Sequence, residues 1–378
     1  MALEKTKIAL IGSGCISETY LRNMTTRWNI LEVVGCSDLI EERSAHRAEQ
    51  FGIRQMTNEE ILNDPEIKIV VNTTYPTAHY EVSKAALLAG KNVHCEKMMA
   101  VTLEEGEELI ALAEQKGLKF GVAPDTFLGA SHQTARRIID SGWIGEPFMV
   151  QARVVRGYHP LMERMEDLSF VFKKGGGIPF DMGGYYLHDM IQLLGPVKRC
   201  GGFVQTRHPD RLCLNTKNPM YGKPLDICTP NALVGALEFE NGVLGSIAFC
   251  SEGFGEYAGI EVYGTEGTLF VPDPNWFNGD VYLARKPSDE KFLVPYTHGY
   301  TAQCCRGLGV ADMAWALRNH RDNRTSGQLG LHVFEIIHGI WRGAQEGKLH
   351  DMKHMCKQPA ALPAGFTLPG EEERALDN

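Results

Sequence analysis

The sequence has no run of about 20 apolar residues, the length that a membrane-spanning helix needs. Its first residues, MALEKTKIALIGSG, also lack the apolar core of a secretory signal, because the short run IALIG leads directly into glycines. None of the ten cysteines stands in a CxxC pair, a common mark of zinc and redox sites. We therefore expect reduced thiols, no bound metal and a cytoplasmic location.

Basic residues are in the minority. The chain has 38 Lys and Arg against 47 Asp and Glu, a formal net charge of -9. Neither nucleic acid nor an anionic membrane is therefore expected as a partner. The 378 residues, 43% of them hydrophobic, exceed one typical domain. Length and composition thus indicate a globular protein of two domains.

A dinucleotide-binding pattern lies near the start of the sequence. The buried strand expected for KIALI is followed by GSGCIS and a helix-like segment. Gly12 and Gly14 match the first two glycines of G-x-G-x-x-G, which form a tight turn and let the backbone approach a pyrophosphate. Ser17 replaces the third glycine. Cys15 and Ile16 lie in the same turn and are expected beside the coenzyme.

A carboxylate closes the second expected strand, ILEVVGCSD. Asp38 at its end is placed to accept hydrogen bonds from both hydroxyls of the adenosine ribose. The same charge would repel a 2′-phosphate, and no arginine follows immediately, so NAD is favoured over NADP. The alternative is a solvated aspartate that merely ends a strand.

Strand-like and helix-like segments alternate through the first third of the chain. The apolar runs IKIVVNTT, KNVHCEK and KFGVAP are separated by AHYEVSKAALLAG and LEEGEELIALAEQKG, which predicts a doubly wound parallel sheet. Ligands of such sheets bind at the carboxyl ends of the strands. These ends carry Gly12–Ser17, Asp38, Thr73–Pro76, Glu96–Lys97 and Pro124–Phe127.

The stretch AGKNVHCEKMMA resembles the AGKHVxxEKP signature of the glucose-fructose oxidoreductase/inositol dehydrogenase (Gfo/Idh/MocA) family. The segments GSGCIS, YPTAHYEV, GGGIPFDMGGYYLHDM, IIDSGWIGEP, VYGTEGTLFV and RNHRDNRTSGQLGLHVFEII also fit, so the resemblance spans most of the chain. It implies an α/β fold with an NAD-binding Rossmann domain over 1–128. It further implies an α+β domain over 129–378, built on a large, mostly antiparallel open sheet.

The composition of residues 145–290 agrees with such a sheet, because short β-like runs alternate there with glycine turns. In the family, the outer face of this sheet often forms a subunit interface. The resemblance therefore implies a homo-oligomer, either a dimer or a tetramer.

Hydride exchange between a carbinol carbon and nicotinamide C4 is the chemistry that the resemblance implies. The substrate hydroxyl must also lose its proton to a base, and a nearby cation stabilises the developing alkoxide. Lys97 matches the lysine of the family's EKP and is the candidate cation. Met98 stands where the family has proline. The conformation of the local backbone, including whether a peptide bond there is cis, is therefore left open.

Strand ends and resemblance together point to further residues on the coenzyme side, namely Thr73, Thr74, Pro76, His79, Glu96 and Lys97 itself. His79 matches a family histidine near the cofactor. A role at the start of a helix is the alternative for it.

The stretch GGGIPFDMGGYYLHDM resembles the family motif GGGxxxDxGxHxxD. Asp181 matches the first aspartate, whereas Tyr185 stands at the histidine position and His188 at the last aspartate. If 181–194 is one helix, the spacing i, i+4 and i+7 places these three residues on one face. Tyr185 is then the expected acid and base, helped by the Lys97 cation, and Asp181 orients the lysine or a substrate hydroxyl.

Other residues have more open roles. His188 is a second base, a substrate ligand or a packed histidine, whereas Tyr186 and Asp189 fall off the shared face and are expected to be structural. Asp125 and Thr126 follow a strand and are expected to touch substrate or nicotinamide.

Two further segments are weaker candidates. Tyr158 and His159 in RGYHP are expected to line the substrate side. The segment LHDMKHMC at 349–356 holds two histidines, an aspartate and a cysteine, but its spacing is generic and we assign no metal to it.

The leading interpretation is an NAD-dependent dehydrogenase that acts on a secondary hydroxyl of a sugar, glycoside or cyclitol, with pyranose C3 as a specific case. A second interpretation keeps NAD tightly bound and uses oxidation followed by re-reduction for sugar transfer, epimerisation or glycoside cleavage. A third is a catalytically silent NAD-binding sensor, against which the presence of Lys97, Asp181 and Tyr185 together argues.

Overall fold

The computed structural model describes residues 3–157, 169–365 and 372–377. Contacts divide the chain into two compact units. Unit 1 comprises Met1–Ala130, Thr297–Leu331 and Leu362–Asn378, and unit 2 comprises Ser131–Tyr296 and His332–Ala361. Tyr158 and His159 lie outside the described residues.

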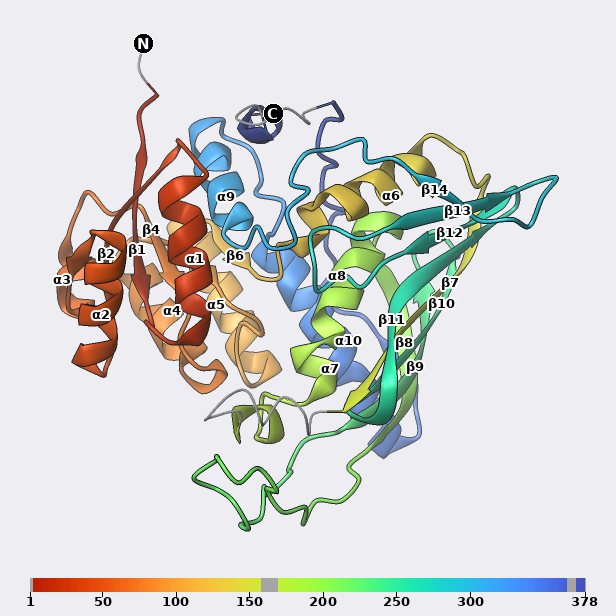
Figure 1. The fold of residues 1–378 in the computed structure, drawn as a ribbon, viewed down its shortest axis with the longest axis horizontal. Helices are drawn as coiled ribbons and strands as arrows, with labels where there is room; N and C mark the ends of the chain where they lie inside the picture. Colours follow the sequence, from red (N-terminus) through yellow and green to blue (C-terminus); the bar gives the residue numbers. More distant parts are fainter. Residues whose placement is uncertain (1–2, 158–168, 366–371, 378) are drawn as a thin grey trace. The chain divides into compact units, whose positions relative to one another are not determined.

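Unit 1 contains a six-stranded sheet in the order β3-β2-β1-β4-β5-β6 (Figure 1). All its strand pairs are parallel, so the expected doubly wound sheet is confirmed. Its strands are β1 (Thr6–Ile11), β2 (Leu31–Ser37), β3 (Arg54–Gln55), β4 (Ile69–Asn72), β5 (Asn92–Cys95) and β6 (Phe120–Val122). Its helices are α1 (Cys15–Thr26), α2 (Glu41–Phe51), α3 (Asn58–Asn63), η1 (Pro76–Ala78), α4 (His79–Leu88), α5 (Leu103–Lys116), η2 (Thr126–Leu128), α9 (Leu308–Arg318) and η5 (Glu372–Leu376).

Local sequence explains several of these elements. The run Ile69–Val71 in β4 is fully buried, as a parallel strand covered on both faces requires. Thr102 and Glu105 form a capping box that begins α5. The same helix ends at Gly117, which adopts a left-handed conformation.

Unit 2 contains a nine-stranded sheet in the order β14-β13-β12-β11-β7-β10-β9-β8-β15. Its pairs are antiparallel except β7 with β10, which confirms a mostly antiparallel sheet. Its strands are β7 (Pro147–Gly157), β8 (Val197–Gln205), β9 (Ala232–Phe239), β10 (Leu244–Cys250), β11 (Glu252–Gly264), β12 (Gly267–Val271), β13 (Val281–Arg285), β14 (Phe292–Val294) and β15 (His350–Asp351).

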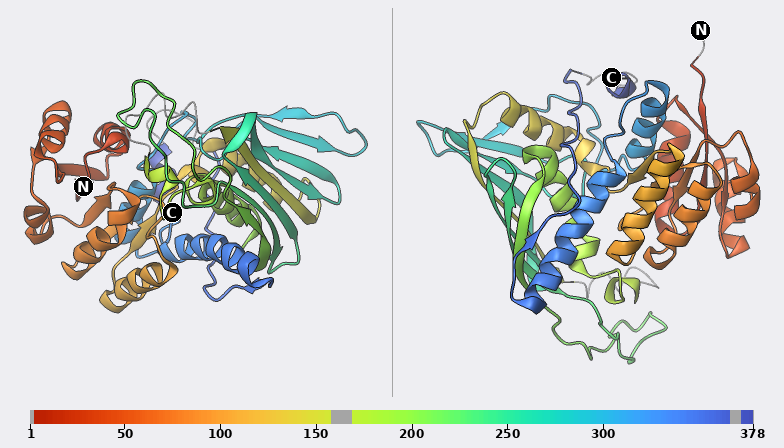
Figure 2. Two further views of the ribbon diagram at one scale, coloured as in Figure 1. Left: turned by 90° about the horizontal axis from the view of Figure 1, so that it is seen from below. Right: turned by 180° about the vertical axis from the view of Figure 1, so that it is seen from behind.

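The helices of unit 2 gather on one face of this sheet (Figure 2). They are α6 (Ala130–Asp140), α7 (Ile178–Asp181), α8 (Gly183–Leu194) and α10 (Gly327–Glu346), with a short helix η4 (Ser169–Phe172). Alternation along β9 fits this arrangement, because Leu233 and Leu237 are buried while Val234 is exposed. In the described ranges, no helix is long and apolar enough to cross a membrane.

The two units differ from the expected domains in one respect. Residues 297–331 and 362–378, which we expected in the second domain, belong by contacts to unit 1. The backbone explains this, since the Val122 N–H of β6 donates to the Thr325 carbonyl at 3.0 Å. Farther along, the Glu373 carboxylate accepts the backbone N–H groups of Asn29 and Ile30 at 2.9 and 2.8 Å. The chain thus returns to complete the first unit.

Candidate active site

The glycine turn after β1 has the geometry of a dinucleotide cradle. Gly12 has φ +102°, and a Cβ there would lie 2.6 Å from the Thr74 backbone nitrogen, so a larger residue cannot fit. A Cβ on Gly14 would meet no atom within 4 Å. Thr73 Oγ1 donates to the Gly12 carbonyl at 2.7 Å and fixes the turn. The open space lies where α1 begins, and no side chain caps that helix, so its N–H groups suit a pyrophosphate.

Asp38 lies at the same sheet edge as this turn. Its Oδ2 accepts the Ser13 N–H at 2.7 Å, and its Oδ1 accepts the Ile40 N–H at 2.8 Å. A carboxylate has about four acceptor positions, so capacity remains for ribose hydroxyls. Glu41 and Glu42 in the first turn of α2 add negative charge nearby. Together these groups fit NAD and disfavour a 2′-phosphate.

The segment that carries Lys97 is anchored by its neighbour Glu96. Glu96 is buried; its Oε1 accepts the Tyr20 hydroxyl of α1 at 2.7 Å, and its Oε2 accepts the Lys97 N–H at 3.1 Å. Burial and the Glu96 charge hold the pKa of Tyr20 well above its usual value, so Tyr20 remains a donor. The Lys97–Met98 peptide bond is cis. Glu96 thus ties Lys97 to the helix that begins at the glycine turn.

His79 supports the same segment from the other side. Its Nδ1 lies 2.7 Å from the Met98 carbonyl, and its Nε2 lies 3.0 Å from the Thr74 carbonyl. Burial lowers the pKa of His79, which favours the neutral ring. His79 also begins α4, as the alternative interpretation stated. We therefore describe it as a residue that positions the Lys97 segment and the Thr73–Thr74 strand end.

Asp125 and Thr126 are held by contacts within unit 1, and the contact with substrate or nicotinamide expected for them stays a prediction. Asp125 is buried, and its Oδ2 accepts the N–H groups of Gly307 and Gly309, each at 2.9 Å. Burial raises the pKa of Asp125 to about 6. The carboxylate therefore caps α9, and Thr126 is buried in η2. Sequence could not reveal this, because the capped residues lie far away along the chain.

The glycine stretch of unit 2 forms a turn and two helices, whereas we expected one helix over 181–194. Gly177 has φ +88°, and a Cβ there would lie 2.7 Å from the Thr229 side chain. Helix α7 ends at Asp181, and α8 begins at Gly183 after the single residue Met182. Gly183 packs closely at the start of α8, because a Cβ there would lie 2.7 Å from the Phe249 ring of β10.

The three residues expected on one helical face lie on two helices. Asp181 is partly exposed at the end of α7, while Tyr185, which is 5% exposed, and His188 lie on α8. His188 Nδ1 donates to the Gly184 carbonyl one turn back at 2.7 Å. Burial lowers the pKa of His188 to about 4, so it is a poor base near neutral pH. The burial and this hydrogen bond favour the packed histidine among the three roles stated for His188, and its roles as a base or substrate ligand stay predictions.

Tyr186 and Asp189 are structural, as expected. The Tyr186 hydroxyl donates to Asp273 Oδ1 at 2.9 Å. Asp189 is fully buried and pairs with His132 of α6 at 2.7 Å. His132 and Asp273 were not singled out from sequence, since neither stands in a recognisable motif and both partners are distant along the chain.

The segment 349–356 is also structural. Glu335 of α10 is buried and accepts the His350 ring N–H at 2.8 Å. Glu335 also accepts the backbone N–H groups of Lys353 and His354, each at 2.8 Å. These contacts occupy the carboxylate, and the described residues contain no group of three or more acidic, His or Cys side chains that could hold a metal ion.

Family models match both parts of the chain. Residues 6–123 match the model described as an oxidoreductase family with an NAD-binding Rossmann fold, and residues 132–270 match a GFO/IDH/MocA C-terminal domain. Among curated proteins, 1,5-anhydro-D-fructose reductase of Ensifer adhaerens is 32% identical over 249 residues, which cover 63% of this chain and 67% of that protein. Inositol 2-dehydrogenase/D-chiro-inositol 3-dehydrogenase of Lactiplantibacillus plantarum is 29% identical over 152 residues, covering 39% and 43%.

Solved structures share the fold over nearly the whole chain. Levoglucosan dehydrogenase in complex with NADH has a TM-score of 0.80 at 20% identity, covering 93% of this chain and 100% of that chain. An NAD-binding oxidoreductase from Klebsiella pneumoniae also has a TM-score of 0.80, at 22% identity, covering 92% and 99%. At such identities the likeness establishes the fold alone.

Proposed function

Because the chain belongs to the Gfo/Idh/MocA family of NAD-binding oxidoreductases, we propose that it transfers hydride between NAD and a secondary hydroxyl of a sugar, glycoside or cyclitol. The observation that carries this proposal is the coenzyme edge, where Gly12, the open space at Gly14 and Asp38 come together. Relatives named for anhydrofructose and inositol support a polyhydroxylated substrate. Oxidation at pyranose C3 is the specific case that we put forward.

The chain's own residues must manage the substrate proton. Bound nicotinamide supplies the hydride acceptor or donor. We assign Lys97 the role of the cation that stabilises the developing alkoxide. Tyr185 exchanges the hydroxyl proton, and Asp181 orients the lysine or a substrate hydroxyl. These three roles follow the family resemblance, and the anchoring of Lys97 through Glu96 and His79 supports the first of them.

A substrate panel tests the proposal. The purified protein is mixed with NAD and single sugars, glycosides or cyclitols, and NADH is followed by its absorbance. We expect NADH to form with at least one substrate, and Lys97→Met to abolish it while NADH binding remains. A panel that gives no NADH, together with denatured protein that releases no nucleotide, would contradict the proposal. Released nucleotide without turnover would instead indicate tightly bound NAD.

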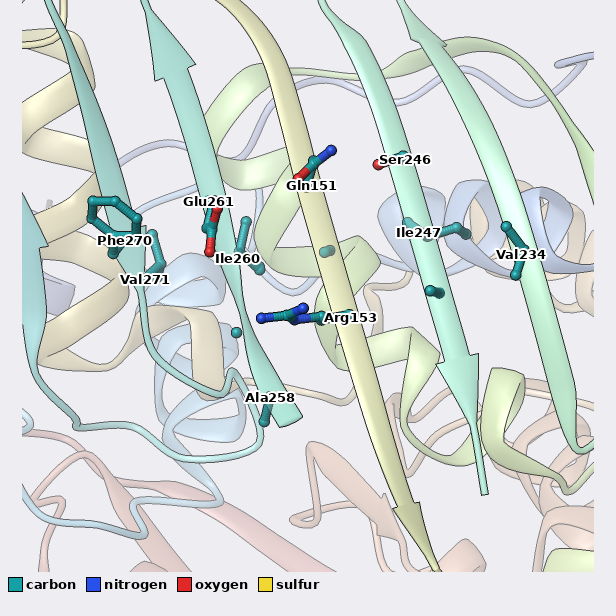
Figure 3. Close-up of a pocket in the computed structure, with 13 residues that line it drawn as sticks. Gln151, Arg153, Val234, Ser246, Ile247, Ala258, Ile260, Glu261, Phe270 and Val271 are labelled. Atoms are coloured by element: carbon teal, nitrogen blue, oxygen red, sulfur yellow. The ribbon is translucent and has the colours of Figure 1, made fainter. Parts of the chain in front are cut away.

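The outer face of the unit 2 sheet supports the proposal of a homo-oligomer. A hollow of about 570 Å³ lies on this face, lined by Arg153, Glu261, Val234 and Phe270 among others (Figure 3). Val234 in its lining is exposed, and the Arg153 guanidinium lies 5.2 Å from the ring centre of Tyr257, which is also exposed. A basic and an acidic side chain on one face suit a second copy related by a two-fold axis. Light scattering that gave a monomer would contradict this.

A further inference from the structure

Two adjacent cysteines of unit 1 each face a guanidinium group. Arg27 Nη1 donates to Cys305 Sγ at 3.2 Å, and Arg306 Nη1 donates to Cys304 Sγ at 3.3 Å. They are also the only neighbouring pair among the ten cysteines of the sequence. Cys304 is partly exposed, whereas Cys305 is buried. The pair therefore combines one accessible thiol with one protected thiol, both beside positive charge.

These surroundings give the two thiols different chemical roles. The thiolate is the reactive nucleophile of a cysteine, and a guanidinium N–H can donate a hydrogen bond to its sulfur. Cys304 has such a neighbour and is reachable from solvent. Burial raises the pKa of Cys305 to about 12, so Cys305 remains a thiol. Cys304 is thus suited to react first and Cys305 to react second.

We propose that Cys304 and Cys305 form a peroxide-sensitive dithiol that regulates coenzyme binding. The Cys304 thiolate attacks the terminal oxygen of a hydroperoxide; the O–O bond breaks and an alcohol or water leaves, giving a sulfenic acid. The Cys305 thiol then gives up its proton as its sulfur attacks the Cys304 sulfur; the S–O bond breaks, the hydroxyl leaves with that proton as water, and a disulfide forms. The hydroperoxide gains two electrons, and the two thiols lose two electrons and two protons.

The resulting bond is expected to be readily reversible. Cα atoms of consecutive residues lie about 3.8 Å apart, which is shorter than the separation of about 4.4–6.8 Å in most disulfides. Strained disulfides are the more easily reduced and the more often regulatory ones. Formation of the Cys304–Cys305 disulfide must therefore shift the backbone around residues 304–306.

That backbone is bonded to the coenzyme-binding part of unit 1. The Arg306 carbonyl accepts Asn23 Nδ2 of α1 at 2.9 Å. Gly307 donates its N–H to Asp125 at the end of β6, and a Cβ on Gly307 would lie 3.0 Å from Met24 of α1. A shift here disturbs the helix that begins at the glycine turn. Oxidation is thus expected to weaken NADH binding.

The experiment uses the full-length protein and does not depend on the substrate. Reduced protein is treated with hydrogen peroxide, and the remaining thiols are alkylated with iodoacetamide in denaturant before digestion with trypsin. The peptide 292–306 contains Cys304 and Cys305 and no other cysteine. Before oxidation we expect two alkyl groups on this peptide. After oxidation we expect no alkyl group, and a peptide mass that is lower by two hydrogen atoms than that of the unalkylated dithiol. Dithiothreitol should restore the first pattern.

NADH titration by fluorescence measures the consequence. We expect peroxide to weaken NADH binding by about fivefold or more. Cys304→Ser should bind NADH normally and lose this response, whereas Cys228→Ser, which removes an exposed thiol of unit 2, should keep it. Phenylarsine oxide, which bridges two thiols with loss of water, should bind wild type and not Cys304→Ser. The proposal is overturned if peptide 292–306 stays doubly alkylated, or if peroxide weakens NADH binding equally in Cys304→Ser.

Discussion

His132 and Asp189 form a fully buried ion pair in which His132 Nδ1 lies 2.7 Å from Asp189 Oδ2. The other ring nitrogen, Nε2, lies 2.8 Å from the Trp276 carbonyl. Both nitrogens face oxygen acceptors, and one of these is the Asp189 carboxylate, whose charge favours the doubly protonated ring. Burial alone would lower the pKa of His132, but the Asp189 charge and hydrogen bond raise it above its usual value. The pair fixes α8, the helix of Tyr185, to α6.

Asp189→Asn is expected to destabilise the protein strongly. The substitution leaves a buried imidazolium without its counter-charge, which costs about 3–5 kcal/mol of unfolding free energy. Urea unfolding measures this. Asp140→Asn is the matched control, because Asp140 pairs with Arg136 on α6 but is about half exposed, and such pairs contribute about 0–1 kcal/mol. Equal losses in the two variants would show that the buried pair has no special role.

The His132–Asp189 pair also predicts how the unfolding free energy changes with pH. The folded pKa of His132 is raised, so its contribution is fully present below the unfolded pKa of about 6.5 and is lost as pH rises through the folded pKa. The unfolding free energy of wild type minus that of His132→Gln should therefore decrease as pH rises through the folded pKa of His132. A difference that instead grew with pH would contradict the assignment.

The burial of His188 predicts the opposite dependence of stability on pH. Its folded pKa is about 4 because of burial, so the unfolded chain binds an extra proton between about pH 6.5 and pH 4. Wild type should lose stability through this window as pH falls. His188→Asn keeps a hydrogen-bond donor for the Gly184 carbonyl. Between pH 7 and pH 5 its unfolding free energy should fall by on the order of 2 kcal/mol less than that of wild type. His94, also with a pKa of about 4, is unchanged in both proteins. Parallel pH profiles would contradict this account of His188.

The two glycines of the coenzyme turn should respond differently to alanine. Gly14→Ala places a Cβ in open space, so the variant should fold like wild type but lose about tenfold or more in NADH affinity, equal to about 1.4 kcal/mol. Gly12→Ala meets backbone at 2.6 Å with an unfavourable φ, so it should lose both stability and coenzyme binding. Thermal unfolding and NADH titration separate the two. Unchanged NADH affinity in Gly14→Ala would contradict the placement of the pyrophosphate.

Sequence revealed those parts of the site that depend on neighbours in the chain. Gly12, Gly14 and Asp38 follow strands at recognisable spacings, and the parallel sheet brings the strand ends to one edge. The partners of Asp125, Gly307 and Gly309, were not found from sequence because they come from a distant segment that returns to unit 1. Such pairings depend on tertiary structure that periodicity does not encode.

The helix break at Met182 was missed for a similar reason. Residues around Met182 are compatible with a continuous helix, and Met182 itself has helical backbone angles. Gly183 also lies close to Phe249 of β10, a packing relation between elements that the local pattern does not show. The partners of Tyr186 and Asp189, which are Asp273 and His132, likewise lie far away along the chain.

Transfer of deuterium to the coenzyme tests the central claim most directly. The protein is incubated with NAD and a pool of sugars and cyclitols that carry deuterium on their carbinol carbons, and the reduced coenzyme is analysed by mass spectrometry. The account predicts NADH that carries one deuterium. It also predicts a rate lower by about 10²-fold or more in Tyr185→Phe, with NADH affinity unchanged. Reduced coenzyme without deuterium, or a Tyr185→Phe variant as fast as wild type, would contradict it.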